Sequence, residues 1–205
     1  VYDNVTVYTG LALGVATFFY AFQVYCDFSG YSDIARGVAK LLDIELMTNF
    51  KSPYFAASLK EFWSRWHISL STWFRDYVYI PLGGSRRGEW RTQRNLLITF
   101  LVSGLWHGAS WTYVIWGGLH GLGQIVEKMW NRRFPPKKER RSVIRVLIVF
   151  CFVCVAWIFF RASTFSDAVY VLTHLFEGVG NPVSYVKAGY EAFRTAGLMQ
   201  STDLK

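Results

Sequence analysis

Long apolar runs separated by short basic segments are the feature that most restricts how this chain can fold. Val5–Tyr25 is mostly apolar, and its length is close to the roughly 20 residues that a helix needs to cross the hydrocarbon core of a bilayer. Val146–Phe160 is another apolar run, and Arg161 ends it. We expect both runs to be membrane helices, because a helix satisfies its backbone hydrogen bonds internally, as lipid requires.

Composition supports this assignment. Charged residues make up 18% of the 205 residues, apolar residues 52% and aromatic residues 19%, whereas soluble domains usually carry about 25% charged residues. The net charge is +8. Basic proteins can bind nucleic acid, but here Lys and Arg cluster between apolar runs, which is typical of cytoplasmic loops. Gly83 and Gly84 lack the spaced glycines and lysine of a phosphate-binding loop. We therefore expect a membrane protein without a nucleic-acid partner.

Two basic segments flank the apolar stretch Asn95–Trp130. Ser85–Arg94 holds four Arg residues, and Asn131–Arg145 holds seven Lys or Arg residues with one Glu. If both segments are cytoplasmic, the chain enters the membrane and returns between them. His107 would then lie roughly 20 Å beyond Arg94, at about 1.5 Å per helical residue. The pattern thus predicts His107 at the bottom of a cavity that is reached only through protein.

The other segments are shorter or more polar. Leu59–Tyr79 is amphipathic and aromatic but too charged to span, which favours an interfacial or re-entrant helix. The remaining expectations are a helix over Ser29–Leu42, a loop at Asn49–Pro53, a turn at Pro81–Gly84, a short amphipathic helix over Ser166–Phe176 and a weakly patterned tail from Glu177.

His107 is the strongest candidate for chemistry. An ionisable residue in an apolar segment is a functional-site hypothesis by default, and the glycines at 104 and 108 would let helices pack closely around it. A neutral histidine can accept a proton from a hydroxyl near physiological pH, which suits a general base. The alternative is a histidine that only hydrogen-bonds between helices.

The other histidines are weaker candidates for a chemical role. His67 lies among aromatic and charged residues and is either a site residue or an interfacial histidine on a wet helix face. We expect a packing or supporting role for His120 and an exposed position for His174. Their spacing is not that of a zinc site, so we expect no metal. The cysteines at 26, 151 and 154 are expected to be lipid-facing or packing thiols.

Four charged residues could contact a substrate. Asp27 and Asp33 could bind an ion or a substrate hydroxyl, but such residues more often cap a helix or pair with a neighbour such as Arg36. Arg75 could hold a phosphate or carboxylate of a donor, or it could form a local ion pair with Asp76.

Three segments make a family resemblance visible. YCDFSGYSDIARG, EFWSRWHISLSTWFRDYVYIPLGG and GLWHGASWTYVIWGGLHG resemble the membrane-bound O-acyltransferase family, in its branch of bacterial alginate O-acetyltransferases. The resemblance runs from Phe22 to Phe165, with the motifs in the family's order. The family's invariant histidine falls on His107 and its second histidine motif on His67. Family members are usually longer, so we expect residues 1–205 to be the C-terminal part of one membrane domain, with N-terminal helices absent.

The resemblance implies an all-α, polytopic fold with a tunnel, in the bacterial inner membrane. A cytoplasmic thioester, acetyl-CoA or an acyl carrier, would donate an acetyl group as substrate, with no bound cofactor. The acceptor would be a hydroxyl of an exported polysaccharide or a periplasmic partner transferase. His107 would activate the acceptor, and His67 would orient it or stabilise the oxyanion. Trp106, Arg75, Asp76 and Asp27 are the candidates for substrate binding.

Other functions stay open from the sequence. The sister branch transfers D-alanine to teichoic acid, although it tends to depart from this chain at the PLGG turn. A transporter or channel can also hold His and Asp at mid-membrane, but only Asp27 and Asp33 would qualify here. A scaffold for a polysaccharide export complex is a third possibility.

Overall fold

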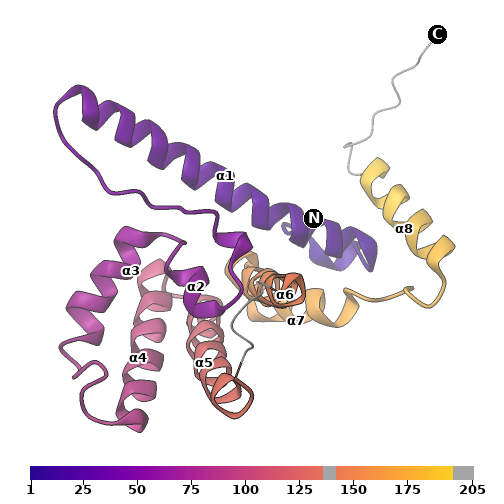
Figure 1. Ribbon diagram of the computed structural model, residues 1–205. Helices are drawn as coiled ribbons and strands as arrows, with labels where there is room; N and C mark the ends of the chain where they lie inside the picture. Colours follow the sequence, from indigo (N-terminus) through magenta and orange to yellow (C-terminus); the bar gives the residue numbers. More distant parts are fainter. Residues whose placement is uncertain (136–141, 196–205) are drawn as a thin grey trace.

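The computed structural model describes residues 1–135 and 142–195, and its regular secondary structure there is helical (Figure 1). Two short 3₁₀ turns, η1 and η2, precede α1 and α2, and a π-helical segment, η3, follows α3 directly. The elements in chain order are η1 (Val5–Val7), α1 (Leu11–Leu41), η2 (Pro53–Phe55), α2 (Leu59–Trp63), α3 (Ile68–Phe74), η3 (Arg75–Tyr79), α4 (Glu89–His107), α5 (Trp111–Arg133), α6 (Val143–Arg161), α7 (Phe165–His174) and α8 (Pro182–Thr195).

Two helices, α1 and α6, are long and apolar enough to cross a membrane. The span expected at Val146–Phe160 is confirmed as α6. The expectation of a helix over Val5–Tyr25 followed by a separate one is wrong in its boundaries, because α1 begins at Leu11 and continues without a break to Leu41. Gly10, with φ of 54°, precedes the helix. Gly30 lies inside it with open space where a Cβ would be, so it does not interrupt the helix.

Helices α4 and α5 form an antiparallel hairpin, as the two basic segments predicted (Figure 1). Gly104 lies against the backbone of Tyr113, and Gly117 lies against the backbone of Phe100. At the other end of the hairpin, Glu89 pairs with Lys128 (3.4 Å) and Arg132 (2.5 Å). The two basic segments therefore lie at one end of the hairpin, and the loop of residues 108–110 lies at the opposite end.

The basic segments are more helical than expected. Helix α4 begins at Glu89, so Arg91 and Arg94 belong to its first turns and not to a loop. Helix α5 continues to Arg133, and the middle of the second basic segment, residues 136–141, lies outside the described residues. Basic residues in the last turn of α5 oppose the negative end of the helix dipole, which helps the helix to extend.

The single amphipathic helix expected over Leu59–Tyr79 is wrong. The segment is divided into α2, α3 and η3, with a break at residues 64–67. The following turn forms as expected, with positive φ at Gly83 (108°) and Gly84 (53°). Both glycines supply a backbone conformation that other residues rarely adopt.

An aromatic core lies where α6 packs against α1, α5 and α7. Its fully buried side chains include Trp116, Trp157 and Phe62. The helix expected near Ser166–Phe176 is confirmed as α7. Helix α8, which the weak pattern after Glu177 did not predict, packs against the start of α1 through Gly189 and Leu11. His174 was expected to be exposed, but it is partly buried, and its ring stacks on Tyr170 at 3.9 Å between centroids.

Candidate functional site

His107 lies in an aromatic enclosure at the end of α4. Its ring centroid is 5.0 Å from that of Trp106, 5.0 Å from that of Trp116 on α5 and 5.2 Å from that of Phe160 on α6. The helix ends here because Gly108 is extended and Ser110 caps the next helix, its hydroxyl accepting from the Thr112 N–H at 3.4 Å. Three helices thus position one partly buried imidazole.

His107 lies farther from the basic end of the hairpin than the roughly 20 Å expected from the sequence. Helix α4 starts at Glu89 and His107 is its last residue, so the histidine lies about 27 Å from the basic end, at about 1.5 Å per residue. It is level with Phe160, the penultimate residue of α6. His107 is therefore at the end of the helical layer remote from the basic residues.

His67 occupies the break between α2 and α3 in a strained backbone conformation. Its φ and ψ are 44° and 55°, in the left-handed region, which costs a non-glycine residue about 1–3 kcal/mol and persists only where its surroundings enforce it. Asn49 supplies that enforcement. Its carbonyl oxygen accepts from the Ile68 N–H at 3.1 Å, and its side-chain oxygen accepts from the Ser69 N–H at 3.0 Å and from the Ser69 hydroxyl at 2.6 Å.

The His67 ring is packed against α1. Its centroid is 4.6 Å from that of Phe28 on α1, edge to face. Its Nδ1 is buried without a hydrogen-bond partner. His67 lies outside both candidate spans, and burial, followed by the charge that His107 would carry, lowers the pKa of His67 to about 4. The imidazole of His67 is thus neutral near pH 7.

His120 is fully buried on α5, one helical turn after Trp116. The Trp63 indole N–H donates to its Nδ1 at 3.2 Å, so a neutral His120 carries its proton on Nε2, which has no partner. The Trp116 ring lies between the two histidines, 5.0 Å from His107 and 5.1 Å from His120. This position agrees with the supporting role expected for His120.

Arg75 and Asp76 bind each other. Arg75 donates to both carboxylate oxygens of Asp76, at 2.7 and 3.2 Å, which is the local ion pair left open by the sequence. These hydrogen bonds raise the pKa of Arg75 and lower that of Asp76. Trp106, in contrast, is 58% exposed beside His107 and also meets the Phe74 ring of α3 at 6.3 Å. Of the binding candidates, Trp106 is the one in direct contact with a site histidine.

Asp27 lies on the exposed side of α1, next to Phe28. Together with Phe28 and other side chains of α1 it lines a shallow concavity of about 390 Å³. Through Phe28 this concavity adjoins His67. Asp33 instead pairs with Arg36 at 3.4 Å, as one reading of the sequence predicted.

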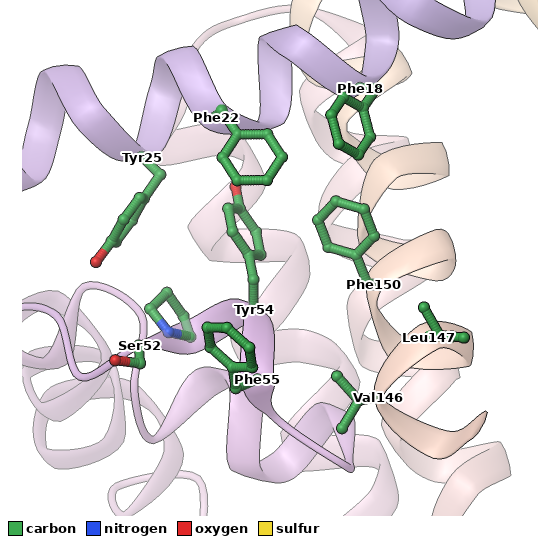
Figure 2. A pocket seen from close by; sticks show the side chains of 10 residues that line it. Phe18, Phe22, Tyr25, Ser52, Tyr54, Phe55, Val146, Leu147 and Phe150 are labelled. Carbon is green, nitrogen blue, oxygen red and sulfur yellow. The ribbon is translucent and has the colours of Figure 1, made fainter. Parts of the chain in front are cut away.

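A separate apolar pocket of about 300 Å³ lies between α1, the η2 turn and α6 (Figure 2). Phe18 and Phe22 face Phe150 and Tyr54 across it, and no histidine lines it. Within the described ranges no group of His, Cys, Asp and Glu could hold a metal ion, and the cysteines at 26, 151 and 154 are free thiols. None of the histidines or of the binding candidates Trp106, Arg75, Asp76 and Asp27 lines this pocket.

Sequence reasoning missed the aromatic partners Phe28, Trp116 and Phe160, and also Glu127, whose carboxylate reaches the start of α2. Aromatic residues are so frequent here that no signal distinguishes these three. For Glu127 a signal existed. It directly follows the second apolar run, Ala109–Val126, and an acidic residue beside such a run is uncommon.

The sequence of this chain is similar to those of known proteins. The sequence profile of the membrane-bound O-acyltransferase family matches residues 1–165. The chain is 48% identical to the probable alginate O-acetylase AlgI of Pseudomonas putida over 149 residues, which cover 73% of this chain and 30% of that protein. It is 42% identical to the peptidoglycan O-acetyltransferase of Helicobacter pylori over 174 residues, which cover 83% of this chain and 33% of that protein.

A more distant similarity is to the teichoic acid D-alanyltransferase of Bacillus subtilis, with 32% identity over 168 residues, or 75% of this chain and 42% of that protein. The chain thus spans about a third of the length of the acetyltransferases that it matches.

Proposed function

Because this chain belongs to the membrane-bound O-acyltransferase family, we propose that it carries the acyl-transfer site of a membrane O-acyltransferase, with His107 and His67 as the reacting pair. The observation that carries the proposal is the setting of each histidine. His107 ends α4 inside an aromatic enclosure, and Asn49 holds His67 in a strained conformation at the start of α3, whose Phe74 contacts Trp106 beside His107. Strained non-glycine residues cluster at functional sites.

The chemistry would be acyl transfer from sulfur to oxygen. His107 takes the proton of the acceptor hydroxyl as that oxygen attacks the thioester carbonyl. The tetrahedral intermediate then collapses, the carbon–sulfur bond breaks, and the thiolate leaves with the proton returned through His107. His67, neutral and with one ring N–H, orients the acceptor or donates to the oxyanion. The aromatic walls around His107 would exclude the water that hydrolyses a thioester.

The acyl group is proposed to be acetyl, from acetyl-CoA or an acyl carrier on the cytoplasmic side. The acceptor is a hydroxyl of an exported polysaccharide or a periplasmic partner transferase. Identity of 48% to an alginate O-acetylase and 42% to a peptidoglycan O-acetyltransferase, against 39% over a shorter stretch and 32% to two D-alanyltransferases, supports acetyl over D-alanyl transfer. The multi-pass location would be a bacterial inner membrane, since the family is membrane-bound and the relatives are bacterial.

The binding candidates differ in support. Trp106 contacts His107 and keeps more than half of its surface exposed, so it could line the path by which a substrate arrives. Asp27 could bind a substrate hydroxyl in the concavity beside Phe28. Arg75 and Asp76 would have to open their mutual ion pair to bind a donor. A transporter is less well supported, because Asp33 is used in an ion pair with Arg36.

The test is transfer of labelled acetyl groups by membranes that contain the complete protein. His107→Ala should lower the rate by about 10²–10⁴, the contribution of one acid–base group, at an unchanged amount of folded protein. His174→Ala is the matched control, because His174 lies on α7, and the hydrogen bonds described for its ring are to Tyr170 and Thr173, close by in sequence. Near-normal transfer by a well-expressed His107→Ala protein would remove the catalytic assignment.

A further inference from the structure

One face of α5 connects the neighbourhood of His107 to the short helix α2. Trp116, which contacts the ring of His107, is followed on this face by His120, Gly123 and Glu127. These positions are spaced by four, three and four residues, so they form a stripe along the helix. In the described part of the chain, the hydrogen bonds between α2 and α5 all involve residues of this stripe.

Glu127 holds the first turn of α2. Its two carboxylate oxygens accept from the Leu59 N–H at 3.1 and 2.9 Å. A carboxylate at the start of a helix satisfies orphan N–H groups and opposes the positive end of the helix dipole. Glu127 is partly buried, 68 residues away in sequence from Leu59, so this contact is tertiary and not part of a local cap.

The close approach depends on Gly123. A Cβ there would lie 2.8 Å from Leu59 Cδ1 and 2.7 Å from Phe152 Cζ. Without a side chain at 123, α2 lies against the surface of α5 within reach of Glu127. Ser58 caps α2 locally by accepting from the Glu61 N–H at 3.0 Å, so Glu127 is not needed merely for α2 to begin.

His120 holds the other end of α2. The indole N–H of Trp63, the last residue of α2, donates to its Nδ1 at 3.2 Å. Four residues later the chain reaches His67. Both ends of α2 are therefore fixed to α5, and the strained histidine follows directly from the fixed segment.

We propose that Glu127 is a positioning residue, which clamps α2 to α5 so that His67 is held in register with His107. The proposal rests on the proposed function of the two histidines. A displacement of about 1 Å at a reacting group can cost roughly a hundredfold in rate, and α2 is too short, at five residues, to hold its own position.

The experiment compares Glu127→Gln with Glu89→Gln in the purified complete protein. Both residues are Glu at the same end of the hairpin, but Glu89 pairs with Lys128 and Arg132 and not with α2. Three quantities are measured: kcat and KM for radiolabelled acetyl-CoA, the melting midpoint, and hydrogen exchange of the peptide covering residues 57–67. Glu127→Gln should lower kcat about tenfold or more, leave KM within about twofold, and speed exchange in residues 57–67 only.

The outcomes separate the possibilities. A kcat equal to that of Glu89→Gln overturns the proposal. So does a loss of kcat accompanied by faster exchange throughout the hairpin, or a variant that cannot be recovered folded, because either result would make Glu127 a residue of general stability. If the wild type transfers no acetyl group, or His107→Ala transfers it normally, the proposed function fails, while the exchange of residues 57–67 still reports whether Glu127 clamps α2.

Discussion

An alanine at Gly117 would test the close approach of α4 and α5 that places His107. The added Cβ would overlap the Phe100 carbonyl oxygen, and it would lie 3.0 Å from the carbonyl carbon and 3.3 Å from the Gly104 nitrogen. These are backbone atoms, which cannot rotate away, so the two helices would have to separate. Overpacking of this kind costs about 1–3 kcal/mol. The better helix propensity of alanine returns about 0.5–1 kcal/mol.

We therefore expect Gly117→Ala to destabilise the protein by about 1–2 kcal/mol, and the neighbouring Gly118→Ala to be neutral or slightly stabilising. At Gly118 the nearest atom to a Cβ is Leu101 Cδ2, at an ordinary contact distance of 3.6 Å. The two variants carry the same chemical change one residue apart on α5, so propensity, hydrophobicity and expression are matched.

The assay is thermal unfolding of the complete protein in detergent, with the exposed Cys26 and Cys151 replaced by Ser, followed with a thiol-reactive dye that reads the partly buried Cys154. The propensity gain is common to both variants, so Gly117→Ala should melt roughly 2–12 °C below Gly118→Ala, from the overpacking cost of about 1–3 kcal/mol at about 2–4 °C for each kcal/mol. Acetyl transfer should fall in the first variant and not in the second, because a shift of α4 moves His107 relative to Trp116. Equal melting midpoints would refute the packing argument.

Three further predictions concern the histidines and the membrane orientation. His67→Asn, which keeps a residue type that tolerates the left-handed backbone, should impair transfer at matched protein amount more than His120→Ala does, and equal losses would mean that the pair is misassigned. Cysteines at Ser85 and Arg133 should both resist a membrane-impermeant thiol reagent in intact cells and react after permeabilisation, whereas labelling of only one would contradict a hairpin whose ends meet at Glu89. Asn49→Ala should lower transfer with little change in the melting midpoint, because it removes the side-chain hydrogen bonds to Ser69 beside His67. A transfer rate equal to that of the wild type would show that the break between α2 and α3 keeps its conformation without these bonds.

Apolar runs and charge distribution predicted several of the structural elements. The span at α6, the hairpin of α4 and α5, and the short helix α7 follow from long apolar runs, basic flanks and an amphipathic pattern, which are local properties of the sequence. The ends of α4 and α5 were placed too far inside the apolar runs. Polar residues can extend a helix beyond its apolar run, as Arg91 and Arg94 do in α4, so hydrophobicity alone does not locate the ends.

The break at His67 could not be predicted, because its cause is remote in sequence. Nothing within Leu59–Tyr79 is a helix breaker, and the segment lacks Gly and Pro. The break is fixed by Asn49, some twenty residues earlier, through hydrogen bonds to Ile68 and Ser69. A pattern that is read along one segment cannot include a partner that tertiary folding brings to it.

The same reasoning explains why polar residues in the apolar run of α5 are poor guides when each is read alone. His120 and Glu127 both suggest chemistry, since a polar group at membrane depth is costly. In the structure, both meet hydrogen-bond donors on α2, and neither touches His107. Their polar atoms fix the position of a neighbouring segment that is too short to be held by apolar contact alone. His107 differs because its neighbours are aromatic rings and the described contacts give its imidazole no hydrogen-bond donor or acceptor, so its ring nitrogens remain available to a substrate. Among buried histidines, the one whose partners are apolar is therefore the better candidate for a reacting group.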